Sequence, residues 1–422
     1  MTASTLPYGA SPPDSWVVVP LKYLTTLTNG YVFNSADWVD AGTPIIRIEN
    51  LNGSLNFNHS GSMLPGRYRV KSGDLLFSWS GNPGTSFGPY LWNEPGDYYL
   101  NQHIFKMGVS GCDARWLYWS LKAATHWIER ELTSGMIGMV HVTKEELAAV
   151  PIPVPPVELQ RRIADFLDAE TARIDALGQM LQQQISLLEM RRQIQITDSV
   201  TGSDSDAQRS LHAVAEVVLG RQRAPQHAEG QHMVPYLRAA NVKDGRLELS
   251  DVMAMNFTPD EQRIFALRPG DVLVTEGSGS LKAVGAAAVW AGELVGKVCF
   301  QNTLLRIRPR PGLADGKFLE WWARSTFASG EFAAIATGAN IYHLSAERVR
   351  SLLTRFPDLD KQRRIADHLA EETRRIDRLI AARRRQVGLL TERRQALITA
   401  AVSGQFDVST ASRRKVTDGV NA

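Results

Sequence analysis

Two short polar segments carry side chains suited to hydrogen bonding with an external partner. They are "SWSGNPGTSF", residues 78–87, and "TEGSGSLKAV", residues 275–284, and each begins at the end of an apolar run that follows a Gly-Asp turn. Their hydroxyl, amide and ammonium groups have the chemistry that pairs with base edges in the major groove of DNA. At any single position, an ordinary surface turn is an equally good interpretation.

Further polar residues at corresponding places in the two halves extend this pool of candidate DNA contacts. In the first half the candidates are Arg47, Asn50, Ser78, Ser80, Asn82, Thr85, Ser86, Asn101, Gln102 and His141. In the second half they are Arg238, Asn241, Thr275, Ser278, Ser280, Lys282, Gln301, Asn302, Asn340, Tyr342 and His343. For the two histidines, packing or capping of the following helix is the alternative interpretation.

Patterns typical of catalysis are missing from the sequence. The segment "GELVGKV" from Gly292 has three residues between its glycines and a valine after the lysine, so it is no phosphate-binding loop. No Asn-Pro-Pro-aromatic or Asp-Pro-Pro-aromatic tetrapeptide of an amino-methyltransferase occurs, and no Cys/His spacing suits zinc. We therefore expect no catalytic residue, no metal site and no cofactor in this chain.

The elements that must position the polar segments form an internal sequence repeat. The stretch "QRRIADFLDAETARIDAL" from Gln160 returns as "QRRIADHLAEETRRIDRL" from Gln362, 202 positions later (362 − 160). At the same offset, residues 187–202 resemble residues 389–404 without a gap. A shared apolar period alone would not reproduce Gln-Arg-Arg-Ile-Ala-Asp, so the repeat indicates an internal duplication.

The segments before the repeated stretches echo each other more faintly. The run "PIIRIENLNGSLNF" resembles "PYLRAANVKDGRLEL", and short β-type runs alternate with turns in both halves. The aromatic-rich segments 114–132 and 316–335 each predict a helix. The fold class is therefore α+β, with two similar domains whose loops differ, and this suggests one task performed on two targets.

Each repeated stretch predicts a long helix. Residues 158–199 show apolar positions at three- and four-residue steps, sustained over several heptads, and the second copy has a similar stripe. Gly202 and Gly404 suit the helix ends. A narrow stripe needs a partner, and antiparallel pairing of the two copies would give a pseudo-twofold chain. A generic coiled coil is the alternative.

The predicted boundaries follow from this organisation. A first domain spans residues 1–150, a first long helix 151–202, a second domain 203–354, a second long helix 355–404 and a tail 405–422. The second helix region holds 12 basic and 7 acidic residues, although the net charge of the whole chain is only +3. A solvated helix face is the simpler interpretation of these arginines, and a phosphate or acidic-partner surface is the other.

The cysteine content and the apolar segments indicate the cellular compartment. Two cysteines in 422 residues are too few for a disulfide framework, which favours a reducing cytoplasm. We find no signal peptide and no apolar run long enough to span a membrane.

The assembled pattern resembles the specificity (S) subunits of type I restriction–modification systems. The residues that carry the resemblance are "PDSWVVVPLKYL", the two Gly-Asp turns, "VHVT" and "YHLS", and "PIPVPPVELQRRIADFLD" with its echo "FPDLDKQRRIADHL". The resemblance covers residues 13–404. It implies a non-enzymatic subunit with two target recognition domains, each reading one half of a bipartite site in double-stranded DNA.

The resemblance also implies partners. The helices would fix the unread spacer and dock methyltransferase (M) subunits, two in number, which hold S-adenosylmethionine, and restriction (R) subunits would join for cleavage. The expected docking residues are Gln160, Arg161, Ile163, Leu167, Gln362, Arg363, Ile365 and Leu369. The competing hypotheses are a coiled-coil scaffold whose domains bind proteins, and a self-contained methyltransferase or nuclease, for which the motifs are missing.

Overall fold

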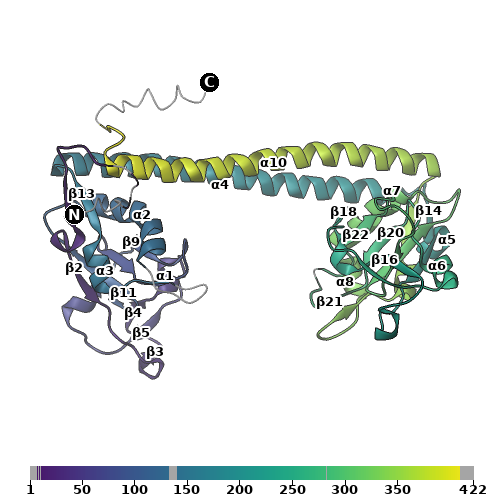
Figure 1. Cartoon of the computed structure of the whole chain (residues 1–422), viewed down its shortest axis with the longest axis horizontal. Coiled ribbons are helices and arrows are strands. Elements are labelled where there is room, and N and C mark those ends of the chain that lie inside the picture. Colours follow the sequence, from purple (N-terminus) through teal and green to yellow (C-terminus); the bar gives the residue numbers. More distant parts are fainter. Residues whose placement is uncertain (1–6, 8, 10, 133–139, 282, 409–422) are drawn as a thin grey trace. The chain divides into compact units, whose positions relative to one another are not determined.

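The computed structural model describes residues 7, 9, 11–132, 140–281 and 283–408. The chain divides into two compact units, one made of Met1–Leu181 with Gln386–Ala422 and the other of Gln182–Arg385. Two long helices, α4 (Val157–Val200) and α10 (Leu359–Ser403), each contribute residues to both units (Figure 1). The α+β class with two long helices is confirmed.

The first unit is built on two sheets. An antiparallel sheet has the order β2 (Thr25–Asn29), β11 (Ile104–Val109), β7 (Leu75–Ser78) and β9 (Gly88–Leu91). The other sheet has the order β3 (Trp38–Val39), β5 (Asn58–Ser60), β4 (Thr43–Ile46), β10 (Tyr98–Leu100) and β6 (Arg69–Val70). Because β7 is buried along its whole length, it reads as a continuous apolar run.

Helix α2 (Ala114–Glu131) covers the antiparallel sheet at β9. The Asp113 carboxylate caps it by accepting hydrogen bonds from the backbone N–H groups of Arg115 and Trp116. Its buried face contributes Trp116 and Leu117 to the main apolar core, which also contains Phe77 from β7. The aromatic-rich segment is thus a core helix, as predicted.

The second unit repeats this plan. Its antiparallel sheet has the order β15 (Ala215–Leu219), β24 (Leu304–Pro309), β20 (Val272–Thr275) and β22 (Ala287–Val289). A three-stranded sheet has the order β19 (Met253–Asn256), β16 (Met233–Leu237) and β23 (Cys299–Phe300). The expected single helix over residues 316–335 is instead α7 (Gly316–Ala328) followed by α8 (Glu331–Ile335). Gly330, at φ 81°, breaks it because that backbone conformation cannot continue a helix.

Short elements complete both units. They are α1 (Ile48–Leu51), β8 (Ser80–Gly81), β12 (Val140–His141), α3 (Lys144–Ala149), α5 (Leu211–Val214), β17 (Val242–Lys243), β18 (Arg246–Leu247), α6 (Pro259–Phe265), β21 (Gly277–Ser278), β25 (Tyr342–His343) and α9 (Ala346–Ser351). The strand before each long helix pairs with the first strand of its own domain. These antiparallel pairs are β1 (Val17–Pro20) with β13 (Pro151–Val154), and β14 (Ala207–Ser210) with β26 (Leu353–Phe356).

The long helices pair antiparallel within each unit, as predicted. In the first unit, Ile163 near the start of α4 and Val402 near the end of α10 belong to one apolar core. In the second unit, Glu189 pairs with Arg384 at 2.8 Å. Three residues later on α4, Arg192 pairs with Asp377 at 2.5 Å, so contacts advance along α4 as they retreat along α10.

The seam between the long helices keeps the three- and four-residue steps expected from the sequence. The buried or half-buried positions include Thr171, Ile174, Gly178, Leu181, Ile185, Leu188 and Arg192 on α4, and Thr373, Ile376, Ile380, Arg383, Val387, Leu390 and Arg394 on α10. Leu177 and Leu379 lie beside this seam and are 40% and 44% exposed.

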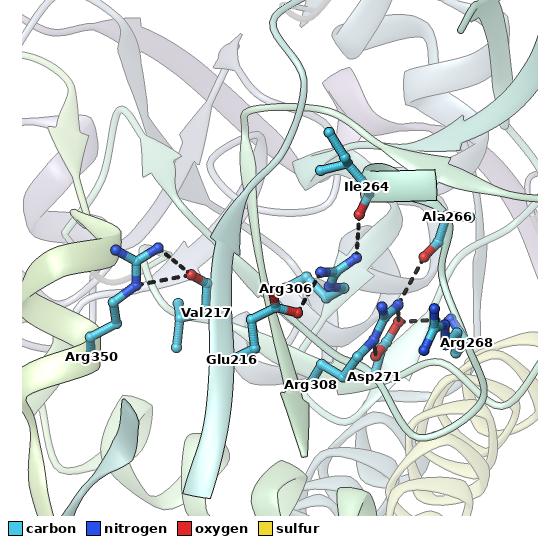
Figure 2. A network of polar contacts seen from close by, with 9 residues as sticks. All are labelled: Glu216, Val217, Ile264, Ala266, Arg268, Asp271, Arg306, Arg308 and Arg350. Carbon is cyan, nitrogen blue, oxygen red and sulfur yellow. Dashed lines mark hydrogen bonds and ion pairs between the residues drawn. The ribbon is translucent and has the colours of Figure 1, made fainter. Parts of the chain in front are cut away.

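A network of arginines stabilises the second unit (Figure 2). Arg308 binds both carboxylate oxygens of Asp271 at 2.7 Å and donates to the Ala266 carbonyl at 2.8 Å. Arg306, with 2% of its side chain exposed, pairs with Glu216 at 3.0 Å and donates to the Ile264 carbonyl at 2.7 Å. Burial lowers the pKa of Arg306, so these partners are what keeps the charged form in place.

The carboxyl group of Glu320 on α7 makes the second unit sensitive to pH. Burial raises its pKa from 4.5 to about 7, against the opposing effect of Arg324. The pKa of Glu320 is therefore higher in the folded state than in the unfolded state. Its neutral carboxyl contributes stability that is fully present below the unfolded-state pKa. That stability is lost as the pH rises through the folded-state pKa. We expect the free energy of unfolding in urea to fall between about pH 5 and about pH 8. Glu320→Gln should flatten that slope, exposed Glu331→Gln should not, and an unchanged slope in Glu320→Gln would contradict this assignment.

Candidate nucleic-acid interface

A cleft of about 540 Å³ in the first unit gathers six of the predicted contact residues. They are Arg47, Asn82, Thr85, Ser86, Asn101 and Gln102. The cleft is also lined by Phe33, Trp38, Ile48, Glu49, Asn52 and His103. Segments that follow β4, β8 and β10 therefore meet in one place, as a shared role in recognition requires.

Arg47 supplies the positive charge of this cleft. Its Nη1 donates to Asn58 Oδ1 at 2.8 Å and pairs with Glu49 at 3.0 Å. Its guanidinium lies 5.3 Å from the centroid of the Trp38 ring. The side chain stays 38% exposed, so N–H groups remain for a phosphate oxygen or a guanine edge.

Two polar atoms beside the cleft are buried without a hydrogen-bond partner among the described residues. They are Gln102 Oε1 and His103 Nδ1, neighbours in the turn between β10 and β11. Burial, His141 and Arg47 lower the pKa of His103, which favours the neutral imidazole. A buried unpaired group costs about 1–3 kcal/mol, so an external partner that paired with either atom would gain affinity.

Trp79 forms the support behind this turn. Its Nε1 donates to the Gln102 carbonyl at 2.9 Å, and its ring centroid lies 5.4 Å from that of His103 and 6.1 Å from that of His141. Strand β12 brings His141 opposite Ser80 of β8. The polar loop and the "VHVT" element therefore join as a two-stranded ribbon.

The second unit presents different chemistry on the same scaffold. The pair β21–β25 sets His343 opposite Gly277, and Gln301 and Asn302 lie in the turn between β23 and β24. Where the first unit has Trp79 beside His141, the second has Glu276 bound to His343 Nδ1 at 3.1 Å. Arg238 pairs with Asp251, and its Nε is buried without a partner among the described residues.

Two glycines hold a further loop against each turn. A Cβ on Gly30 would lie 2.1 Å from the Asn101 carbonyl oxygen, and one on Gly220 would lie 2.2 Å from that of Gln301. Only glycine permits this approach, and it places Tyr31 beside Asn101 in an isolated bridge. Sequence reasoning missed this loop. The signal was a glycine that ends a β-type run in each half.

Comparison with known proteins finds similarity to type I restriction specificity subunits. The model of the type I restriction modification DNA specificity domain matches residues 13–187. The EcoBI specificity subunit of Escherichia coli is 22% identical over 87% of this chain and 80% of that protein. The EcoKI specificity subunit of Escherichia coli strain K12 is 21% identical over 87% and 83%. The chain is therefore similar to type I restriction specificity subunits over most of its length.

Solved structures share the fold of this chain. A chain from a study of complex assembly and conformational transition of the type I R-M system has a TM-score of 0.74 at 17% identity, covering 94% of this chain and all of that one. The HsdS subunit from Thermoanaerobacter tengcongensis has a TM-score of 0.56 at 18% identity, covering 94% and 98%. In the part of the chain that the structure describes, no helix is long and apolar enough to cross a membrane.

Several predicted contact residues have side chains that are buried within the fold. The buried ones are Asn50, Ser78, Ser80, Ser86, Asn241 and Thr275. Asn50 Oδ1 accepts from the Arg47 N–H at 2.9 Å, and Asn241 does the same for Arg238 at 3.0 Å. These amides cap short helical turns and shape the loop, while a contact between these residues and DNA stays a prediction. A sequence cannot separate the two roles because both use the same residue types.

The other candidates keep accessible or half-buried side chains. They are Arg47, Asn82, Thr85, Asn101, Gln102, His141, Arg238, Ser278, Ser280, Gln301, Asn302, Asn340, Tyr342 and His343. Lys282 lies outside the described residues. The structure therefore brings six of the first-half candidates to one cleft and spreads the second-half candidates over the turn and the β21–β25 ribbon.

Most of the expected docking residues are buried inside their own unit. Gln160, Ile163, Leu167, Gln362 and Leu369 are at most 1% exposed, and Ile365 is half-buried. These side chains pack within their own unit, and docking of a second protein at these positions stays a prediction. Arg161 and Arg363 remain exposed.

Proposed function

We propose that this specificity subunit reads a bipartite DNA sequence, with each unit reading one half-site. The duplicated scaffold carries the proposal. Corresponding turns present Asn101, Gln102 and His103 in the first unit and Gln301, Asn302 and Thr303 in the second. Amide side chains at these places pair with adenine edges, and the nearby Arg47 and Arg238 with guanine edges. Two readers with different side chains serve a site whose halves differ.

The subunit supplies specificity, while methylation and cleavage belong to partners. We infer that two M subunits and the R subunits assemble on it, with S-adenosylmethionine bound by M, and that the complex works in the cytoplasm. The long helices then set the length of the unread spacer. A net charge of +3 is small for a free DNA-binding protein, which supports a complex in which M subunits provide much of the phosphate contact.

A genome-wide map of N6-methyladenine tests this proposal. We expect cells that carry the gene to methylate one motif made of two short blocks with a fixed gap, and its deletion to abolish methylation at that motif alone. Restoring the gene should restore the motif, whereas the gene for the M subunit alone should not. Methylation that persists after the deletion would show that another protein directs it.

A further inference from the structure

The glutamine of each repeated motif has no part in the reading of DNA described above. Gln160 and Gln362 are 1% and 0% exposed and occupy the same place in the first turn of α4 and α10. A buried amide needs hydrogen-bond partners, since leaving its donors and acceptor unpaired is costly. The hydrogen-bond partners of each glutamine indicate its structural role.

Gln160 joins two helices and the segment before one of them. Its Oε1 accepts from the Asp113 backbone N–H at 2.8 Å, and its Nε2 donates to the Pro155 carbonyl at 2.8 Å. Asp113 is the N-cap of α2, and Pro155 lies just before α4. One amide therefore ties the start of the recognition domain's core helix to the start of the long helix.

Gln362 makes the same connections in the second unit. Its Oε1 accepts from the backbone N–H of Asp315, the N-cap of α7, at 2.9 Å. Its Nε2 donates to the carbonyls of Pro357 at 2.8 Å and Leu313 at 3.0 Å. Two copies of the motif that have diverged elsewhere thus keep one directed junction between domain and helix.

We propose that Gln160 and Gln362 are positioning residues that fix the angle at which each recognition domain leaves its long helix, and so limit the spacer lengths that the subunit accepts. The inference rests on the proposed function. Apolar packing between α2 and α4 is non-directional and tolerates small rotations, whereas hydrogen bonds weaken steeply when their angles change. A domain without the hydrogen bonds of its glutamine still folds around its apolar core. The subunit then also binds DNA whose half-sites are separated by spacer lengths that the wild-type subunit does not bind.

Methionine substitution tests this role, since Gln160→Met and Gln362→Met keep the side-chain length and remove the amide. The complete complex with its M subunits is assayed for binding to duplexes that carry both mapped half-sites, with the native spacer or one base pair more or less. We expect each variant to reduce the preference for the native spacer about tenfold, which corresponds to about 1.4 kcal/mol. Base preference within each half-site should stay as in the wild type.

The ratio between spacers separates the possible outcomes. A purely structural role would weaken binding to all spacers in proportion, and an unchanged ratio would overturn the proposal. A wild-type complex without sequence-dependent binding would instead overturn the proposed function. Gln179→Met, on an exposed position of α4, is the matched control and should keep the wild-type ratio.

Gln160→Glu adds a test that does not depend on a change of side-chain length or of fold. An ionised carboxylate accepts from Asp113 but cannot donate to the Pro155 carbonyl, whereas the neutral acid does both. Burial raises the pKa of a carboxyl, so the neutral form gains as pH falls. We expect the spacer preference of Gln160→Glu to approach that of the wild type at lower pH. A ratio that stays constant with pH would overturn the hydrogen-bonding basis of the proposal.

Discussion

Asp271→Ala lowers the free energy of unfolding by about 3–5 kcal/mol, the expected cost of breaking a buried ion pair by removing one partner. The side chain of Asp271 is 1% exposed, and that of Arg308 is 15% exposed. Besides Arg308, the carboxylate accepts from the Arg268 N–H at 2.7 Å (Figure 2). Alanine leaves the largely buried Arg308 guanidinium without its carboxylate and leaves the Arg268 N–H without its acceptor.

Urea unfolding of the full-length chain measures this loss. Asp260→Ala is the control on the surface, because its pair with Arg263 is 84% and 80% exposed and such pairs contribute about 0–1 kcal/mol. Asp74→Ala, at the equivalent Gly-Asp turn, removes an ion pair between Asp74 and Lys106, whose side chains are 27% and 25% exposed. Its loss of stability should lie between the losses of Asp260→Ala and Asp271→Ala. Equal losses for Asp271→Ala and Asp260→Ala would show that the network adds no stability.

The duplication and the long helices could be predicted from the sequence because periodicity and caps are local signals. Gly202 and Gly404, expected at the helix ends, adopt φ of 75° and 78° there. The steps of three and four along the stripe are confirmed, but where two apolar residues are adjacent the sequence does not decide which of them lies in the seam. Only packing against the partner helix decides that Ile380 rather than Leu379 is buried.

The site could be predicted only as a pool of residues. The chain turns at Asn101–His103 because β10 and β11 belong to different sheets, and this turn brings the polar side chains to the cleft. Asn50 and Arg47 were equally good candidates in the sequence. In the structure, the Asn50 amide is buried in the short helix α1, whereas the Arg47 guanidinium lines the cleft. Such differences arise from contacts between segments distant in sequence, so local patterns do not contain them.

Gln102→Ala should weaken recognition of one half-site by about 1–3 kcal/mol, or about 5- to 150-fold in affinity. The side-chain oxygen of Gln102 lacks a partner among the described residues, so its removal breaks no hydrogen bond of that oxygen and should leave stability nearly unchanged. What it removes is a donor and an acceptor at the cleft. Asn302→Ala is the counterpart in the second unit and should affect the other half-site.

A binding cycle with the complete complex separates contact from general damage. Four duplexes are compared for each variant, with both half-sites intact, either one scrambled, or both scrambled. Gln102→Ala should lose affinity only where its own half-site is intact, because a scrambled block offers no base edge for Gln102 to recognise. The same loss on all four duplexes would mean that Gln102 contacts phosphate or shapes the turn, and base reading would then have to be assigned to other residues of the cleft, beginning with Asn82 and Asn101.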